Sequence, residues 1–243
     1  MDEKTQVQVN KLADEVYQRL GEKLKSIVLY GSAVTPRFVE GKSDINLLVV
    51  LDKVEVGSLM EIGAIIAKYK KYKFADPVVV DQDYIGRSGD VFPIEFEESK
   101  RGHKIIYGQD PLANIKINPQ DLRLQLEREL KQSLLHLRQM LVQDPGISAD
   151  FISSLAQAGK SVSAQIRGLT MLEPGPEKDP QREPVEKVEK LIGANFPALR
   201  WLIGLRHQKS APKKPEVLNI LPTLHDELGH LVRWIDELGD FQA

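Results

Sequence analysis

The chain has 243 residues, a formal net charge of -2 and a pI near 6.2, and 42% of its residues are hydrophobic. This length and composition predict a soluble globular protein with two domains, since each half is long enough to bury a core. The balanced charge argues against nucleic acid as the main partner. The absence of cysteine excludes disulfides and thiolate chemistry.

The N-terminal stretch MDEKTQVQVNKLADEV is acidic and polar, so it lacks the basic start and apolar core of a signal peptide. No run of about 18 apolar residues, the length needed to cross a bilayer, occurs in the sequence. We therefore expect a cytoplasmic protein without a membrane-spanning segment.

The first predicted elements are a helix and two strands. Apolar residues at helical spacing predict a helix over residues 9–24. Residues 27–30 form a short strand that stops at Gly31-Ser32, and about one helical turn follows in residues 33–38. Residues 45–51 are continuously apolar and are predicted to form a central strand, buried on both faces.

The turn between these strands and the start of the second strand carry the chemistry. Gly31 lets the backbone approach a phosphate closely, and Ser32 adds a hydroxyl donor beside the turn amides. Positions 44 and 46 share one face of a strand, so Asp44 and Asn46 are expected to point into the same site.

This pattern, a strand, Gly-Ser, about a dozen residues and then Ser-Asp-x-Asn in a second strand, resembles the nucleotidyltransferase superfamily of the DNA polymerase β-like and kanamycin nucleotidyltransferase-like enzymes. The resemblance implies that Gly31, Ser32 and Ser43 bind the nucleotide and that Asp44 holds Mg²⁺. The family has a second acid where this chain has Asn46. An amide oxygen can ligate a cation but carries no charge, so we expect weak binding of Mg²⁺ or a single-metal site.

A helix over residues 56–72 is predicted next, and it ends in four lysines, whose simplest interpretation is a solvated helix end rather than a phosphate-binding patch. Strands follow at 77–80 and, from strict alternation, at 91–97. Residues 98–107 are expected to form a helix or a strand that closes this domain, before a turn at 108–111.

The third carboxylate of the family comes from a strand after the second one, and residues 91–112 resemble the closing segment of small bacterial nucleotidyltransferase domains. Glu95 is the better candidate because apolar Ile94 and Phe96 flank it. Glu97 is the reserve.

From Pro119 onward the apolar residues follow a helical period, which predicts an antiparallel helical bundle. Helices are expected at 119–142, at 148–172, at 185–206, bent or interrupted around Phe196-Pro197, and at 220–238. Prolines and charged residues mark 173–184 and 209–215 as exposed loops. The predicted class is α+β: a small mixed-sheet nucleotidyltransferase domain at 1–112, then a helical bundle domain at 113–243.

Two functions follow from the resemblance. The first is a nucleotidyltransferase in which Asp44 and Glu95 are catalytic, Asp44, Asn46 and Glu95 hold Mg²⁺, and a hydroxyl acceptor attacks ATP or another nucleoside triphosphate. The alternative is a catalytically impaired pseudoenzyme that binds a nucleotide or a partner. A carboxylate such as Glu97 or Asp76 in the place left by Asn46 would favour the enzyme. The sequence leaves the acceptor, the base and the oligomeric state open.

A further pattern lies in the helical region. Arg200 and His207 fit the loose Arg-x(4 to 6)-His pattern of the helical HEPN RNases. A chain of this length matches so permissive a pattern by chance about once.

Overall fold

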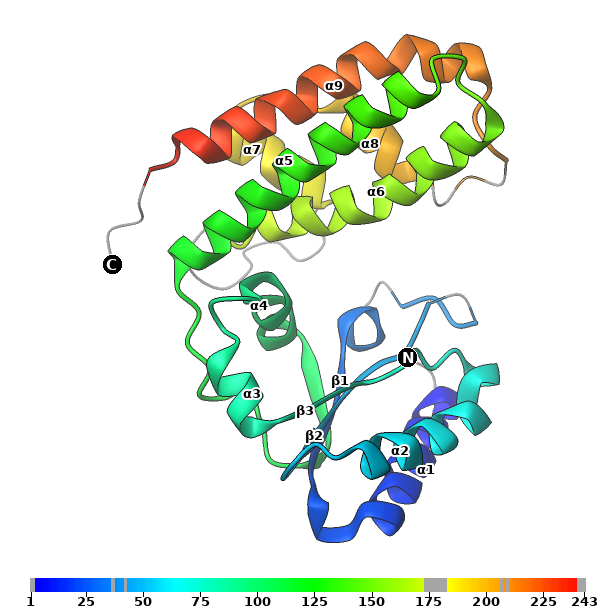
Figure 1. The fold of residues 1–243 in the computed structure, drawn as a ribbon, viewed down its shortest axis with the longest axis vertical. Coiled ribbons are helices and arrows are strands. Elements are labelled where there is room, and N and C mark those ends of the chain that lie inside the picture. The colour runs from blue at the N-terminus through cyan, green and yellow to red at the C-terminus, as the bar shows by residue number, and fades with distance from the viewer. Residues whose placement is uncertain are drawn as a thin grey trace. The chain divides into compact units, whose positions relative to one another are not determined.

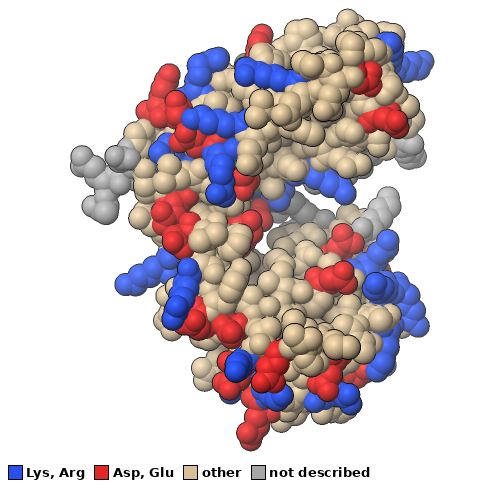
Figure 2. Space-filling model, viewed as in Figure 1, with Lys and Arg blue, Asp and Glu red and all other residues tan. Residues whose placement is uncertain are grey.

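The computed structural model of the protein describes residues 3–35, 38–41, 43–172, 183–205, 208 and 210–239. The chain divides into two compact units, Met1–Ile117 and Asn118–Ala243. The first contains a mixed sheet with helices and the second is helical, so the predicted α+β class is confirmed (Figure 1). No helix among the described residues is both long and apolar enough to cross a membrane. Acidic and basic side chains are interspersed over the face shown in Figure 2.

The sheet of the first unit has the strand order β3-β2-β1-β4. Its strands are β1 (Leu24–Tyr30), β2 (Asn46–Leu51), β3 (Val78–Asp81) and β4 (His103–Gly108). β1 is antiparallel to β2 and β4, whereas β2 and β3 are parallel. The first three strands lie where the sequence predicted them, and the apolar runs of β1 and β2 are buried on both faces.

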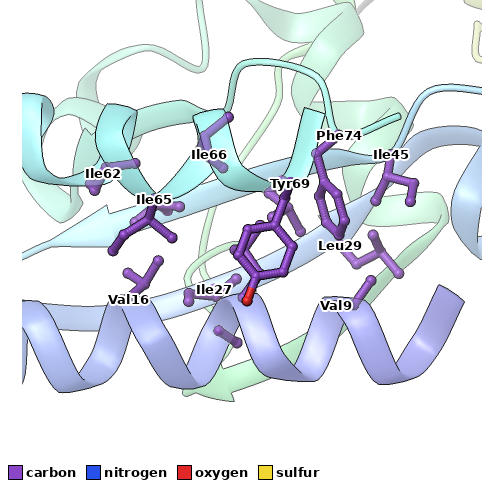
Figure 3. Close-up of a cluster of buried hydrophobic side chains, with 14 of the residues drawn as sticks. Val9, Val16, Ile27, Leu29, Ile45, Ile62, Ile65, Ile66, Tyr69 and Phe74 are labelled. Carbon is purple, nitrogen blue, oxygen red and sulfur yellow. The ribbon is translucent and has the colours of Figure 1, made fainter. Parts of the chain in front are cut away.

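Alternate residues of β1 and β2 enter two different cores. Ile27 and Leu29 pack into the cluster formed with α1 (Glu3–Leu20) and α2 (Val56–Tyr69), which cover one face of the sheet (Figure 3). Val28 and Val50 belong to a second cluster on the opposite face, with Ile85 of α3 (Gln82–Arg87). Each central strand therefore has one face turned away from α1 and α2.

The prediction of a strand at residues 91–97 is wrong, because residues 93–97 form the first part of the helix α4 (Pro93–Arg101). Pro93 occupies the first turn, where its missing N–H costs nothing, and an acid in the first turn and two basic residues in the last suit the helix dipole. Glu97 and Arg101 also form an i,i+4 ion pair at 2.9 Å. These helix signals outweigh the alternation, and the edge strand β4 comes later in the chain.

The second unit is built from α5 (Pro119–Gln143), α6 (Ala149–Leu169), α7 (Pro184–Ile192), α8 (Pro197–Gly204) and α9 (Lys214–Glu237). α5 runs antiparallel to both α6 and α9 (Figure 1). The helix predicted at 185–206 is interrupted by Gly193, which ends α7 in the left-handed region at φ 74°. Residues 173–182 and 209 of the two predicted loops lie outside the described residues, as do 206, at the end of the predicted helix, and 207. α9 begins within the second predicted loop, at Lys214.

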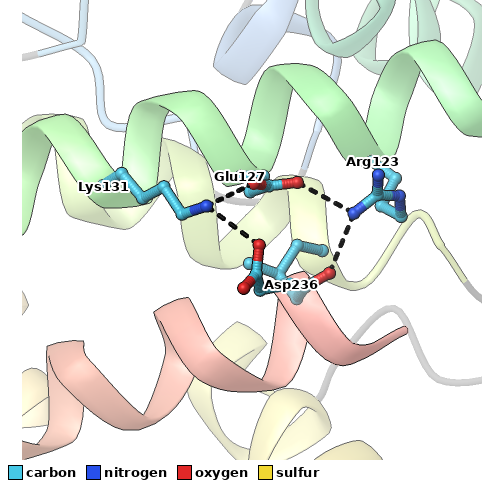
Figure 4. A network of polar contacts seen from close by, with 5 residues as sticks. Arg123, Glu127, Lys131 and Asp236 are labelled. Atoms are coloured by element: carbon cyan, nitrogen blue, oxygen red, sulfur yellow. Dashed lines mark hydrogen bonds and ion pairs between the residues drawn. The ribbon is translucent and has the colours of Figure 1, made fainter. Parts of the chain in front are cut away.

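A network of charged groups joins α5 to the last turns of α9 (Figure 4). Arg123, which is 7% exposed, donates to Glu127 Oε2 at 2.9 Å and to the Ile235 carbonyl at 3.1 Å. Lys131 contacts both Glu127 and Asp236. The Arg123 guanidinium thus provides a hydrogen-bond donor for a carbonyl near the end of α9. This contact links α5 and α9, the first and last helices of the second unit.

Glu227 on α9 caps the start of α8. Its two carboxylate oxygens accept hydrogen bonds from the N–H groups of Ala198, at 3.0 Å, and Leu199, at 2.8 Å. These are two of the amides that the first turn of a helix leaves without partners. Burial raises the pKa of Glu227, and the two amide hydrogen bonds oppose that rise.

The variant Glu227→Gln tests this cap through its pH dependence. Because the folded pKa lies above the unfolded value near 4.5, Glu227 contributes stability that is complete below that pH and is lost as the pH rises through the raised pKa. Gln does not titrate. The free energy of unfolding of the variant should therefore improve relative to that of the unmodified protein as the pH rises above about 4.5. Urea unfolding followed by tryptophan fluorescence measures this gap. A gap that widens against the variant would contradict the raised pKa.

Candidate functional site

The Gly-Ser turn and the polar start of β2 are in contact. Tyr30, the last residue of β1, lies opposite Asn46, the first residue of β2. Gly31 follows with φ 74°, and a Cβ at this position would lie 3.1 Å from Asn46 Nδ2. Glycine is needed here both for the left-handed backbone and for the close approach of the Asn46 amide. The two halves of the sequence motif therefore meet at one point.

The turn continues as the short 3-10 helix η2 (Gly31–Val34). The Ser32 carbonyl accepts hydrogen bonds from both the backbone N–H and the hydroxyl of Thr35, each at 3.0 Å. Among the described residues, the Ser32 hydroxyl itself makes no hydrogen bond. It is half-buried and available to a ligand.

Ser43 holds the chain that enters β2. Its hydroxyl oxygen accepts from the Val39 N–H at 3.0 Å, and its own N–H donates to the Val39 carbonyl at 2.8 Å. A hydroxyl that accepts keeps its own hydrogen for donation, so Ser43 can still donate to a phosphate.

Asp44 and Asn46 lie on the face of the sheet opposite α1 and α2. Ile45 and Leu47 belong to the core beneath those helices, and side chains alternate along the extended chain. Asp44 is exposed, and within the described chain its carboxylate forms no ion pair or hydrogen bond. The site thus offers one uncompensated carboxylate and one amide oxygen on one face.

Asp76 lies beside this segment, in the stretch of chain that leads from α2 into β3. The Ile45 N–H donates to the Lys73 carbonyl at 2.8 Å, and the Ala75 N–H donates to the Ile45 carbonyl at 3.0 Å. Asp76 follows directly and is exposed. Because β2 and β3 are parallel, the acids that precede them reach the same edge of the sheet. The sequence signal was there, since each acid stands just before an apolar run.

Glu95 and Glu97 occupy a different setting from the one expected. Glu95 is exposed in the first turn of α4, and Glu97 pairs with Arg101 in the same helix. Neither residue lies on a strand beside β2. Among the described residues no group of three or more His, Cys, Asp or Glu could hold a metal ion.

Tyr30 and His103 continue the row of paired residues across the end of the sheet. His103, the first residue of β4, lies opposite Tyr30, and its ring contacts the Ser99 carbonyl at 2.9 Å and the Asp110 carboxylate at 3.2 Å. These contacts fasten α4 and the chain after β4 to the end of the sheet. Burial raises the pKa of Tyr30, so its phenol stays protonated at neutral pH.

In the helical unit, Arg200 of the Arg-x(4 to 6)-His pattern pairs with Glu186, at 3.4 Å, and with Glu189 of α7. Position 207 lies outside the described residues. The contacts of Arg200 are those of a residue that joins α8 to α7.

No family model matches the sequence, and neither does any curated protein. Among solved structures, the fold is similar to that of spectinomycin adenyltransferase AAD(9) from Enterococcus faecialis, determined with ATP and spectinomycin. The two share 15% sequence identity with a TM-score of 0.57, and the match covers 92% of this chain and 98% of the other. At this identity the likeness shows the fold, and it extends over both units.

Proposed function

We propose that the first unit binds a Mg²⁺-nucleoside triphosphate where β1 ends and β2 begins, and that it transfers the nucleotidyl group to a hydroxyl acceptor. The observation that carries the proposal is the contact between Gly31 and Asn46, which joins the phosphate-binding turn to the metal-binding strand start. The fold likeness to an adenyltransferase whose structure contains ATP supports it.

Each residue of the site has a role in this proposal. Gly31 allows the triphosphate to approach the backbone, and the hydroxyls of Ser32 and Ser43 donate to phosphate oxygens. Asp44 and the Asn46 amide oxygen would ligate Mg²⁺. This donor set fits one Mg²⁺ whose other ligands are phosphates and water rather than a cage of protein groups. The metal would supply charge neutralisation on the phosphates.

Two residues, Asp76 and Glu95, are candidates for the role of the third carboxylate. Glu95 lies in the helix α4 instead of the strand that the sequence predicted, whereas Asp76 is one residue from the Ala75–Ile45 hydrogen bond. A carboxylate here would accept the proton of the acceptor hydroxyl as its oxygen attacks the α-phosphate and pyrophosphate leaves. We assign this role to Asp76, with Glu95 as the second candidate.

The variant Asp44→Ala tests the binding step. The unmodified protein should be stabilised against heat by ATP with Mg²⁺, because a ligand that binds only the folded state raises the melting temperature. Asp44→Ala should lose the Mg²⁺-dependent part of this shift. Asp52→Ala is the matched control, since Asp52 follows the opposite end of β2 and its ion pair with Lys25 is exposed. An unchanged Mg²⁺ effect in Asp44→Ala would place the nucleotide elsewhere.

A second candidate function is a nucleotide-binding pseudoenzyme of the same fold. Asn46 favours it, together with the lack of a three-carboxylate cluster in the described part of the chain. Both candidates bind Mg²⁺-ATP, but only the enzyme releases pyrophosphate when an acceptor is supplied. Pyrophosphate release across a panel of hydroxyl acceptors separates them.

A further inference from the structure

A cluster of lysines lies at the edge of the candidate site. α2 passes into η3 (Lys70–Tyr72), and the sequence from Lys68 to Lys73 holds four lysines and no acid. Lys and Arg side chains gather in Figure 2 on the side where Figure 1 places the end of α2. From the sequence alone, the simplest interpretation of these four lysines is a solvated helix end.

The backbone places this cluster next to the proposed metal-binding strand. The Lys73 carbonyl accepts the hydrogen bond from the Ile45 N–H at 2.8 Å, so Lys73 is the lateral neighbour of the residue between Asp44 and Asn46. The Lys73 N–H in turn donates to the Lys70 carbonyl at 3.1 Å, which fixes Lys70 to the same turn. Lys73 holds a left-handed backbone at φ 66°, a conformation that glycine adopts more easily.

The described residues compensate only part of the charge in this cluster. Lys68 is paired with Glu15 at 2.9 Å, and the Lys71 ammonium lies 5.0 Å from the centre of the Tyr72 ring. Lys70 and Lys73 are exposed and form no ion pair with the described residues. Three ammonium groups therefore raise the local concentration of anions beside the site.

We propose that Lys70, Lys71 and Lys73 form a phosphate-binding edge of the candidate site. The inference rests on the proposed function, because it places phosphate groups next to the nucleotide. These phosphates belong either to the triphosphate of the nucleotide or to a phosphate-bearing acceptor. A cationic acceptor is repelled by the same charges.

The experiment uses the variant Lys70→Glu/Lys73→Glu and the probe inorganic tripolyphosphate, titrated calorimetrically at low salt. The unmodified protein should bind the probe without nucleotide, and the variant should bind it about tenfold more weakly, because exposed charge pairs contribute modest energies that add over several groups. The control Lys53→Glu reverses an exposed lysine beyond the far end of β2 and should bind like the unmodified protein. Circular dichroism checks that both variants fold.

A second titration, with the protein saturated by Mg²⁺ and α,β-methylene ATP, identifies the source of the phosphate. If the analogue displaces tripolyphosphate and the variant also binds ATP more weakly, the lysines hold the phosphates of the nucleotide. If tripolyphosphate still binds and ATP affinity is unchanged in the variant, they hold those of the acceptor. Equal binding of the probe by the double variant and Lys53→Glu overturns the proposal. Because the first titration contains no nucleotide, failure of Mg²⁺-ATP binding in the unmodified protein would refute the proposed function without deciding this one.

Discussion

Replacing Asn46 with Asp is expected to lower the stability of the metal-free protein by about 1 kcal/mol, because it puts a second negative charge on the strand face that carries Asp44. Addition of Mg²⁺ should restore this stability, and affinity for Mg²⁺ should rise about tenfold as a carboxylate replaces a neutral amide. Pyrophosphate release from ATP should increase if an acceptor is present. Thermal melting across a Mg²⁺ series, with a pyrophosphate assay, measures all three.

Asn10→Asp is the control for the added charge. Asn10 is exposed on α1, where its side-chain oxygen accepts a hydrogen bond from Gln6, and α1 covers the other face of the sheet. This variant should gain no Mg²⁺ dependence. If Asn46→Asp behaves like it, positions 44 and 46 do not form a common metal site, and the proposed function loses its basis.

Replacing Gly108 with Ala should destabilise the first unit by about 3 kcal/mol, the largest effect expected from a single added methyl group here. A Cβ at this position would lie 1.9 Å from the Lys25 carbonyl oxygen, and the backbone has φ 77°. Gly108 pairs with Ser26, two residues before the shift in β1–β4 register between Ile27 and Val28, and the buried Ser26 hydroxyl donates to the Tyr107 carbonyl at 3.0 Å. The two strands cannot separate without losing these bonds.

Gly63→Ala provides the opposite result within the same unit. Gly63 is exposed in α2 with nothing within 4 Å of an added Cβ, so alanine should stabilise by up to about 1 kcal/mol through helix propensity. Urea unfolding followed by circular dichroism measures both variants. Both tryptophans lie in the second unit, so their fluorescence reports separately on that unit. Equal stability of Gly108→Ala and the unmodified protein would contradict the close β1–β4 approach.

The central strands and the motif between them could be predicted from the sequence because burial on both faces requires a continuous apolar run, and β1 and β2 have one each. α4 could not be separated from a strand by periodicity alone, since Ile94 and Phe96 alternate with acids over a short segment. The deciding residue is Pro93, which starts a helix well but cannot donate to a sheet. Whether Pro93 begins a helix or lies in an edge strand depends on whether a partner strand is present, and only the tertiary structure decides that.

The position of Asp76 beside Ile45 could not be predicted either, because it also depends on tertiary pairing. Nothing local shows that residues 73–75 pair with Ile45, because a parallel partner is found only after the crossover through α2. The helices of the second unit were easier, because long leucine stripes such as that of α5 specify a buried face over several turns. Their ends were set by Gly193 and by prolines in the first turns of α7, α8 and α9.

Each unit is closed by its own last element, and this sets an order in which the chain can fold during synthesis. β1 lies between β2 and β4, so its second edge remains open until residue 108 has been made, and Arg123 of α5 gains its partner on α9 only when Ile235 has been made. The loops closed by these contacts are long, and such contacts form late. The first unit can nevertheless be complete before any of α5 is synthesised, so the candidate site is able to form while the helical unit is still unfolded.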